Sequence, residues 1–327
     1  MSAAKTTRPS AAGLRVRFGR TPSAPAAGSR IRARASRGGA VLVEFACIAL
    51  AFYLLFAATV ELGRMVFSQQ AILNAARVGA RELALAELPA TATFDDALRD
   101  PDVRDRIFDP GLLVLDTTDM DDVTFQQRID NFPALNRMLT PLMIRERLTL
   151  GGGDREYFHY PGAILRNENY NPGDPFNAYE YTVAIPKVVS RDSTSGAETI
   201  EWVAVVEEVR PAEYATDPAA APFSMTSTGR DRGMVALRVN YPFQAASMSA
   251  FLPAGTGVNT PIQADDGAVN AASTPDGTAL LGSASGGNNT YSGPYGLGRQ
   301  FALGQEVRPF RRLISAQSMF RREVFSR

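Results

Sequence analysis

Residues 40–60 read AVLVEFACIALAFYLLFAATV, a run in which Glu44 is the single charged residue. As an α-helix rising about 1.5 Å per residue, the run would extend roughly 30 Å, the thickness of the hydrocarbon core of a bilayer. Upstream, residues 1–37 hold nine Lys and Arg and no Asp or Glu. Because basic flanks stay on the cytoplasmic side, the sequence predicts a single-pass inner-membrane protein with a cytoplasmic N-terminus and a periplasmic C-terminal part.

Two other interpretations of this run fit less well. A secretory signal peptide has an apolar stretch of about 7–15 residues followed by a small-residue cleavage site. Here the run is longer, contains an acid, and offers only Ala57-Ala58-Thr59 as a loose match to such a site. A buried helix of a soluble core is usually shorter and lacks a one-sided cluster of positive charge. A membrane span is therefore the preferred prediction.

Composition limits the chemistry that the chain can perform. The 327 residues include 34 basic and 34 acidic side chains, one cysteine, Cys47, and one histidine, His159. Single copies exclude an intrachain disulfide, a Cys-rich zinc site and a two-histidine metal motif. The two lysines, Lys5 and Lys187, follow no glycine loop of the nucleotide-binding kind. We expect no catalytic residue, no cofactor and no metal, and hence a protein that is not an enzyme.

Two weaker patterns have plainer explanations. Asn167, Asn169 and Asn171 have the spacing of calcium ligands, but Pro172 replaces the glycine that such a loop needs, which favours an Asx-rich turn. His159 stands between Phe158 and Tyr160 and is interpreted as a packing residue.

Glu44 lies a fixed distance after Gly39. An ionised carboxylate inside the apolar run costs a few kcal/mol unless it is paired or snorkels to the interface, and both remain open. Cleavage between Gly39 and Ala40 would create an α-amino group with a pKa near 8, largely protonated at neutral pH. Glu44 of a neighbouring subunit would neutralise it. The order of residues from Gly39 to Phe45 resembles the processing site of type IV pilin-like proteins, which a prepilin peptidase cleaves after the glycine.

Three short motifs accompany the span: VEFA at 43–46, ELGR at 61–64 and NAARVGAR at 74–81. In this order they resemble the N-terminal signature of the TadE-like family, minor pilin-like membrane proteins of the tight-adherence (Tad, or Flp) pilus assembly machinery. The resemblance implies that the partners are the bilayer, other pilin-like subunits, the assembly platform and the prepilin peptidase. The motif residues beyond the span that it singles out are Glu61, Gly63, Arg64, Asn74, Arg77, Gly79 and Arg81.

The sequence divides into a basic leader (1–39), a transmembrane helix (40–61), a helical stalk (62–88) and an exported domain (89–327). No proline interrupts the stalk, and its apolar positions recur every three or four residues, as expected of one helix stripe. The members of this stripe are Leu62, Val66, Gln69, Leu73, Ala76, Ala80 and Leu83. Arg77 and Arg81 share a face near Asn74, which is interpreted either as a solvated or self-packing face or as a site for a partner carboxylate.

The exported region is predicted to be α+β. An Asp-rich, Pro-punctuated stretch (91–122) and one or two helices within 123–150 precede strands at 179–189, 200–209 and 234–241, which would form a small antiparallel sheet with one face against helix. Residues 254–298 are rich in Gly, Ser and Asn and are interpreted as a flexible insertion. Residues 233–253 and 311–323 resemble the late strands of the same family, although periodicity alone also allows a helix at 310–324.

These features predict a non-catalytic component of Tad-type pilus assembly or of a related secretion system. The alternative is an envelope enzyme or ligand-binding protein on an uncleaved signal anchor. Binding of nucleic acid by residues 1–37 is not expected, because membrane topology already accounts for their charge.

Overall fold

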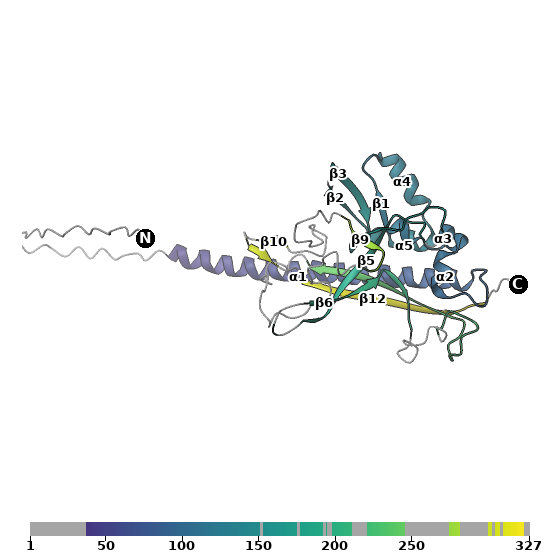
Figure 1. The fold of residues 1–327 in the computed structure, drawn as a ribbon. Helices are drawn as coiled ribbons and strands as arrows, with labels where there is room; N and C mark the ends of the chain where they lie inside the picture. Colours follow the sequence, from purple (N-terminus) through teal and green to yellow (C-terminus); the bar gives the residue numbers. More distant parts are fainter. Residues whose placement is uncertain are drawn as a thin grey trace, which may run out of the picture. The chain divides into compact units, whose positions relative to one another are not determined.

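The computed structural model describes residues 37–150, 153–174, 177–191, 194, 198–210, 221–245, 275–281, 300–302, 305–307 and 310–323. The chain divides into two compact units, Met1–Ala51 and Phe52–Arg327. The described part of the first unit is the beginning of helix α1 (Arg37–Ala84), and the second unit contains the rest of α1 and all the other elements (Figure 1).

Helix α1 confirms the long N-terminal helix expected from the sequence. Every large apolar side chain described between Val41 and Val60 is exposed, from 42% at Leu54 to 71% at Phe56. The helix is long and apolar enough to cross a membrane. Such a surface is unfavourable in water, so these side chains require lipid or another apolar partner.

The second half of α1 is part of the core of the second unit. Ile72, Ala75, Ala76, Ala80 and Leu83 are completely buried. The predicted stripe is therefore buried at its C-terminal end, whereas its first three members, Leu62, Val66 and Gln69, are exposed. The alanines at the buried end let the helix backbone approach the rest of the domain closely. Larger side chains at these positions would hold the helix farther away.

In the described part of the chain, α1 is followed by α2 (Phe94–Arg99), α3 (Pro101–Arg106), η1 (Pro110–Leu113), α4 (Asp122–Asp130), α5 (Ala134–Leu139) and the turn η2 (Thr140–Leu142). The aspartates of the Asp-rich stretch are largely caps. Thr93 and Asp96 form a capping box at α2, and the carboxylates of Asp100 and Asp121 accept backbone N–H groups at α3 and α4. Helix ends at Leu142, so the expectation of helix up to Leu150 is wrong.

All the strands that pair do so in antiparallel fashion. The sheets have the orders β1-β3-β2, β6-β5-β4-β9 and β12-β8-β7, beside a β10-β11 hairpin. This arrangement confirms the α+β class. The bounds are β1 Val114–Asp116, β2 Ile144–Leu150, β3 Gly153–His159, β4 Ala163–Asn167, β5 Tyr181–Arg191, β6 Glu198–Ala204, β7 Val206–Glu208, β8 Met234–Ala245, β9 Thr278–Leu280, β10 Gln300–Ala302, β11 Gln305–Val307 and β12 Phe310–Arg321.

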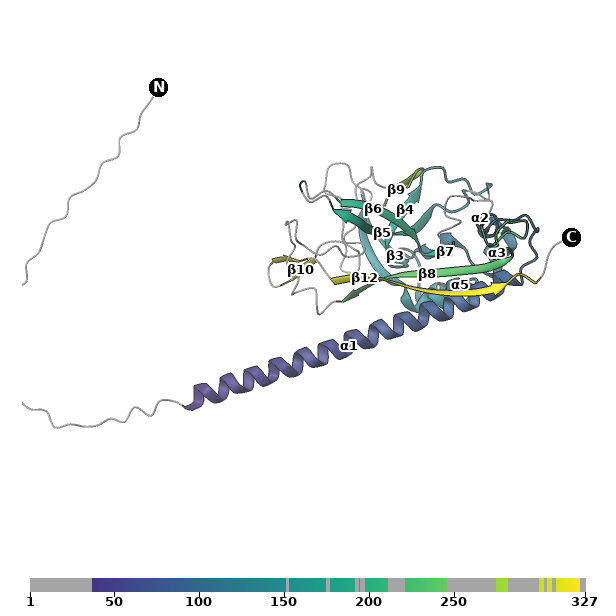
Figure 2. The ribbon, with the colours of Figure 1, turned by 90° about the horizontal axis from the view of Figure 1, so that it is seen from below.

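The longest pairing joins β8 to the C-terminal strand β12, from Phe310 opposite Ala245 to Arg321 opposite Met234. It confirms the strand expected at 311–323 and rules out the helix that periodicity allowed. Figure 2 shows the part of α1 in the second unit running alongside these two strands. One face of this sheet is thus packed against helix, as predicted. The single small sheet expected from 179–189, 200–209 and 234–241 is wrong, because β5 and β6 belong to one sheet and β7 and β8 to another.

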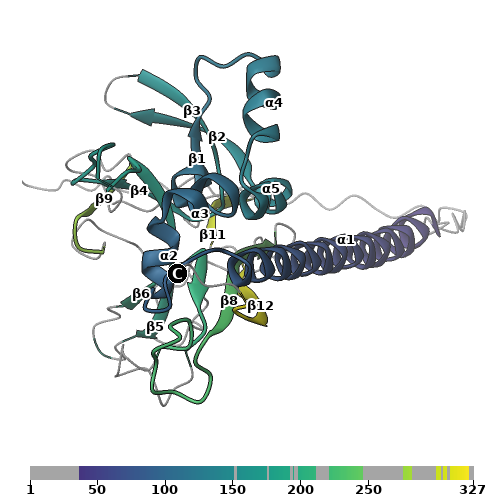
Figure 3. The same ribbon diagram turned by 90° about the vertical axis from the view of Figure 1, so that its right-hand side faces the viewer.

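A separate hairpin, β2–β3, lies on the same side of the domain as α4 (Figure 3). The ring of Phe125 on α4 meets that of Phe158 edge-on at 5.1 Å between centroids. The guanidinium of Arg145 lies 4.0 Å from the centre of the Phe125 ring. Aromatic and cation–π contacts therefore fix α4 to the hairpin.

Most of the predicted flexible insertion, 254–298, lies outside the described residues. Its described part, 275–281, corrects the prediction locally, because β9 pairs with β4 there. Gly277 makes the preceding turn at φ +76°, and a Cβ at this position would lie 2.9 Å from the side-chain nitrogen of Asn169. Glycine is required here for backbone conformation and for space.

Candidate functional site

Gly39 and Ala40 lie in the first turn of α1, which begins at Arg37. Gly38 precedes them, so two of the first three helical residues are glycines. Each glycine disfavours helix by about 1 kcal/mol relative to alanine in a helix interior. The helix is therefore intrinsically weak in this turn.

Glu44 and Phe45 follow on the same helix and are exposed, Phe45 to 69%. Glu44 stands one helical turn after Ala40, on the same face. Within the described residues, Glu44 makes no ion pair or hydrogen bond. Glu44 is therefore an exposed acidic residue within the apolar run.

The ELGR motif connects α1 to the end of β8. Nη1 of Arg64 donates to both carboxylate oxygens of Glu61, at 3.3 and 3.1 Å. Glu61 is 9% exposed, and the guanidinium of Arg64 lies 5.8 Å from the centre of the Phe243 ring. Gly63 faces the opposite way, since a Cβ there would meet nothing within 4 Å. The motif is thus partly an internal ion pair and partly open surface.

Four further residues extend the contact between α1 and β8. They lie on α1, on β8 and in the segment after β3, and none of them was predicted as a site residue. The hydroxyl of Tyr241 is hydrogen-bonded to Ser68, and its ring meets that of Tyr160 edge-on at 5.8 Å. The hydroxyl of Tyr160 donates to the backbone oxygen of Asn240 at 2.9 Å. Burial raises the pKa of Tyr241, against the hydrogen bond from Ser68 and the positive charge of Arg64, and burial raises the pKa of Tyr160 well above its ordinary value.

The NAARVGAR motif has two faces. Gly79 is buried, and a Cβ there would lie 3.0 and 3.1 Å from the methyl groups of Leu135 on α5. Asn74, Arg77 and Arg81 are exposed on the opposite side of α1. Within the described residues, neither arginine has an ion-pair partner. The glycine serves packing inside the domain, whereas the polar residues form an outward face.

The three motifs therefore share one helix and have different surroundings. Residues 39–81 match the family model described as TadE-like protein. The N-terminal segment is TadE-like. No curated protein and no solved structure matches the chain. The TadE-like segment starts at Gly39 and includes the whole exposed apolar run together with all three motifs.

Outside the TadE-like segment, the residues considered for metal binding have structural roles. Among the described residues, no group of His, Cys, Asp and Glu side chains could hold a metal ion. His159 is 1% exposed, with Nδ1 2.7 Å from the backbone oxygen of Tyr160, which confirms it as a packing residue. Asn167 and Asn171 accept N–H groups two residues later, from Asn169 and Gly173, as Asx turns do.

Proposed function

We propose that this protein is a pilin-like membrane component in the assembly of a Tad-type adhesion pilus or a related secretion system, and that it is not an enzyme. The observation that carries the proposal is the TadE-like match over residues 39–81. It coincides with a helix whose first half is exposed and apolar and whose second half is buried in a folded domain. A subunit of this kind would hold its domain at the membrane while the apolar half contacts lipid and other subunits.

The proposed mechanism has two steps at the start of α1. A prepilin peptidase cleaves between Gly39 and Ala40, and the carboxylate of Glu44 then neutralises the amino group of Ala40 on a neighbouring pilin-like subunit. Each charge alone is costly in lipid, so their pairing favours assembly over separate subunits. Phe45 and the apolar side chains that follow supply the packing surface.

Processing is tested by the intact mass of the membrane-extracted chain from cells with and without the prepilin peptidase. We expect the mature chain to begin at Ala40 only when the peptidase is present. Gly39→Val should block cleavage, and the matched variant Gly38→Val should still be cleaved. An intact leader in peptidase-containing cells would favour the alternative, an envelope enzyme or ligand-binding protein on an uncleaved anchor.

Topology is tested separately with one surface cysteine. Asp105→Cys is placed on an exposed position of α3 in a Cys47→Ser background, so that no other thiol is present. A membrane-impermeant maleimide should label it in intact spheroplasts as strongly as after lysis. Labelling that requires lysis would place the domain in the cytoplasm and contradict the proposed orientation in the inner membrane.

A further inference from the structure

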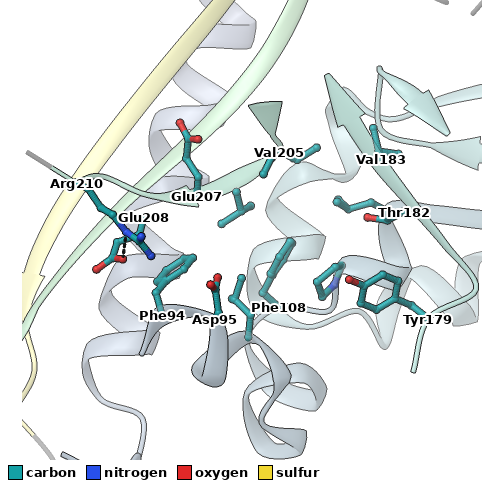
Figure 4. Close-up of a pocket in the computed structure, with 15 residues that line it drawn as sticks. Phe94, Asp95, Phe108, Tyr179, Thr182, Val183, Val205, Glu207, Glu208 and Arg210 are labelled. Atoms are coloured by element: carbon teal, nitrogen blue, oxygen red, sulfur yellow. Dashed lines mark hydrogen bonds and ion pairs between the residues drawn. The ribbon is translucent and has the colours of Figure 1, made fainter. Parts of the chain in front are cut away.

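A cavity of about 400 Å³ lies along β7 and is also lined by residues of α2; none of its lining residues belongs to the TadE-like segment. Polar side chains stand at both ends of its lining, and apolar side chains share the middle with the carboxylates of Asp95 and Glu207 (Figure 4). Glu208 and Arg210 stand at one end and Tyr179 at the other, with Phe94, Phe108 and Val205 between them. This volume lies within the usual range of ligand-binding pockets, and one large apolar side chain would fit into it.

The strand that lines this cavity is also a sheet edge. β7 pairs with β8 on one side and is the last strand in the order β12-β8-β7. Asn240 N–H donates to the oxygen of Val205, and Val209 N–H donates to that of Ala236. Because such bonds alternate along an antiparallel pair, the backbone N–H and C=O of Val206 and Glu208 point away from β8. Within the described residues these groups have no hydrogen-bond partner.

Two of the three carboxylates that line the cavity have hydrogen-bond or ion-pair partners among the described residues, and the third has none. Glu208 accepts from Nε of Arg210 at 2.9 Å and from the N–H of Phe223 at 2.8 Å. Glu207 accepts from Arg238 at 3.1 Å. Asp95, on α2, is exposed and has no hydrogen-bond or ion-pair partner within the described part of the chain. The carboxylates outnumber the one lining arginine, so the rim favours a cation.

We infer that β7 and this cavity bind an extended segment of a partner protein, which adds as a strand to the edge of β7. The segment places one large apolar side chain in the cavity and a Lys or Arg beside Asp95. Backbone hydrogen bonds to Val206 and Glu208 give affinity, and the cavity and Asp95 give specificity, as in other cases of strand addition. The inference does not depend on processing at Gly39 or on the membrane orientation of the domain.

The test uses the full chain in lipid nanodiscs and a fluorescent, end-blocked peptide, Lys-Val-Phe-Val-Lys. We expect saturable binding by fluorescence anisotropy and none to empty nanodiscs. Glu-Val-Phe-Val-Glu should bind at least about tenfold more weakly, because it places like charge beside Asp95. N-methylation of the Lys peptide on the alternate residues whose N–H groups face β7 should abolish binding, whereas N-methylation on the other set should leave it largely unchanged. Failure of the Lys peptide to bind, or retention of full binding by both N-methylated peptides, would overturn the inference.

Two protein variants complete the test. Asp95→Asn should weaken binding of the Lys peptide severalfold and narrow its advantage over the Glu peptide. Asp105→Asn removes an aspartate that is also exposed, from α3 and outside the cavity lining, and should leave the affinity unchanged. If Asp95→Asn and the unchanged chain bound the Lys peptide with equal affinity, Asp95 would have no role in binding. The inference that the partner segment carries a Lys or Arg would then be overturned. Processing at Gly39 is scored independently by mass, so failure of either proposal is distinguishable.

Discussion

Nη2 of Arg322 donates a 2.8 Å hydrogen bond to the backbone oxygen of Leu88, although the two residues are 234 positions apart. The same nitrogen lies 3.1 Å from the oxygen of Pro89, and the guanidinium lies 4.9 Å from the centre of the Phe223 ring. Arg322 is 3% exposed, and burial lowers its pKa. This side chain fixes the end of the C-terminal strand to the segment that follows α1.

Arg322→Ala should therefore destabilise the domain strongly. Removing the side chain takes the Arg322 donor from the buried oxygen of Leu88 and the packing from the Phe223 ring, whereas the oxygen of Pro89 still accepts from the N–H of Ala92. We expect a loss of about 3 kcal/mol in the free energy of unfolding. The neighbour Arg321 is exposed, and Arg321→Ala should change this free energy by less than about 0.5 kcal/mol. Urea unfolding followed by the fluorescence of Trp202, the only tryptophan, measures both. Equal stability of the two variants would show that the contacts of Arg322 do not stabilise the domain.

The two motif glycines of α1 should respond differently to alanine. At Gly63 an added methyl group meets open space, and Gly63→Ala should stabilise the helix by up to about 1 kcal/mol. At Gly79 the methyl group lies 3.0 Å from Leu135, so Gly79→Ala should gain less or lose stability, and Gly79→Val should be clearly destabilising. Trp202-monitored unfolding distinguishes them. A stabilising Gly79→Val would contradict the close packing of α1 on α5.

Stability should fall at alkaline pH because of the buried tyrosines. Burial raises the pKa of Tyr160 and of Tyr241 in the folded state, whereas in the unfolded chain they ionise near pH 10. Above about pH 10 ionisation therefore favours the unfolded chain, and the free energy of unfolding decreases. Tyr160→Phe should cost about 1 kcal/mol at pH 7 through the lost bond to Asn240 and should flatten this decrease.

Urea unfolding at pH 7, 9 and 10.5 measures this dependence. Tyr170 is exposed, so Tyr170→Phe is the matched control and should leave the free energy of unfolding at pH 7 within about 0.5 kcal/mol of the original. An unchanged slope above pH 10 in Tyr160→Phe would show that the Tyr160 hydroxyl is not responsible.

The sequence predicts the elements whose patterns are local. Long helix α1 and strands β5 and β8 have the periodicity or the β-branched composition of their type. Strand β2 does not, because residues 144–150 combine alternating apolar positions with charged residues that also favour helix. Its partner decides the outcome: Arg145 and Arg147 both pair with Glu156 on β3, at 3.6 and 3.9 Å. Such non-local pairing is invisible in a short window.

The candidate site divides in the same way. The motif residues of α1 were identifiable by resemblance, because they follow one another in the sequence. The burial of Glu61 and the packing of Arg64 on Phe243 depend on how β8 meets α1, and nothing local indicates either. The edge of β7 also had no sequence signal, since a strand of three residues is too short to show alternation.

The proposed role of Glu44 is to join this chain to other pilin-like subunits. The most direct test of this role measures how much pilin-like subunit co-purifies with the tagged, membrane-extracted chain, quantified by mass spectrometry. Two variants are compared: Glu44→Gln and the control Glu87→Gln, which lies at an exposed position beyond α1. We predict equal membrane insertion and equal Trp202 fluorescence for both variants, and at least about tenfold less co-purified subunit for Glu44→Gln alone. Equal recovery of the other subunits with both variants would contradict the account.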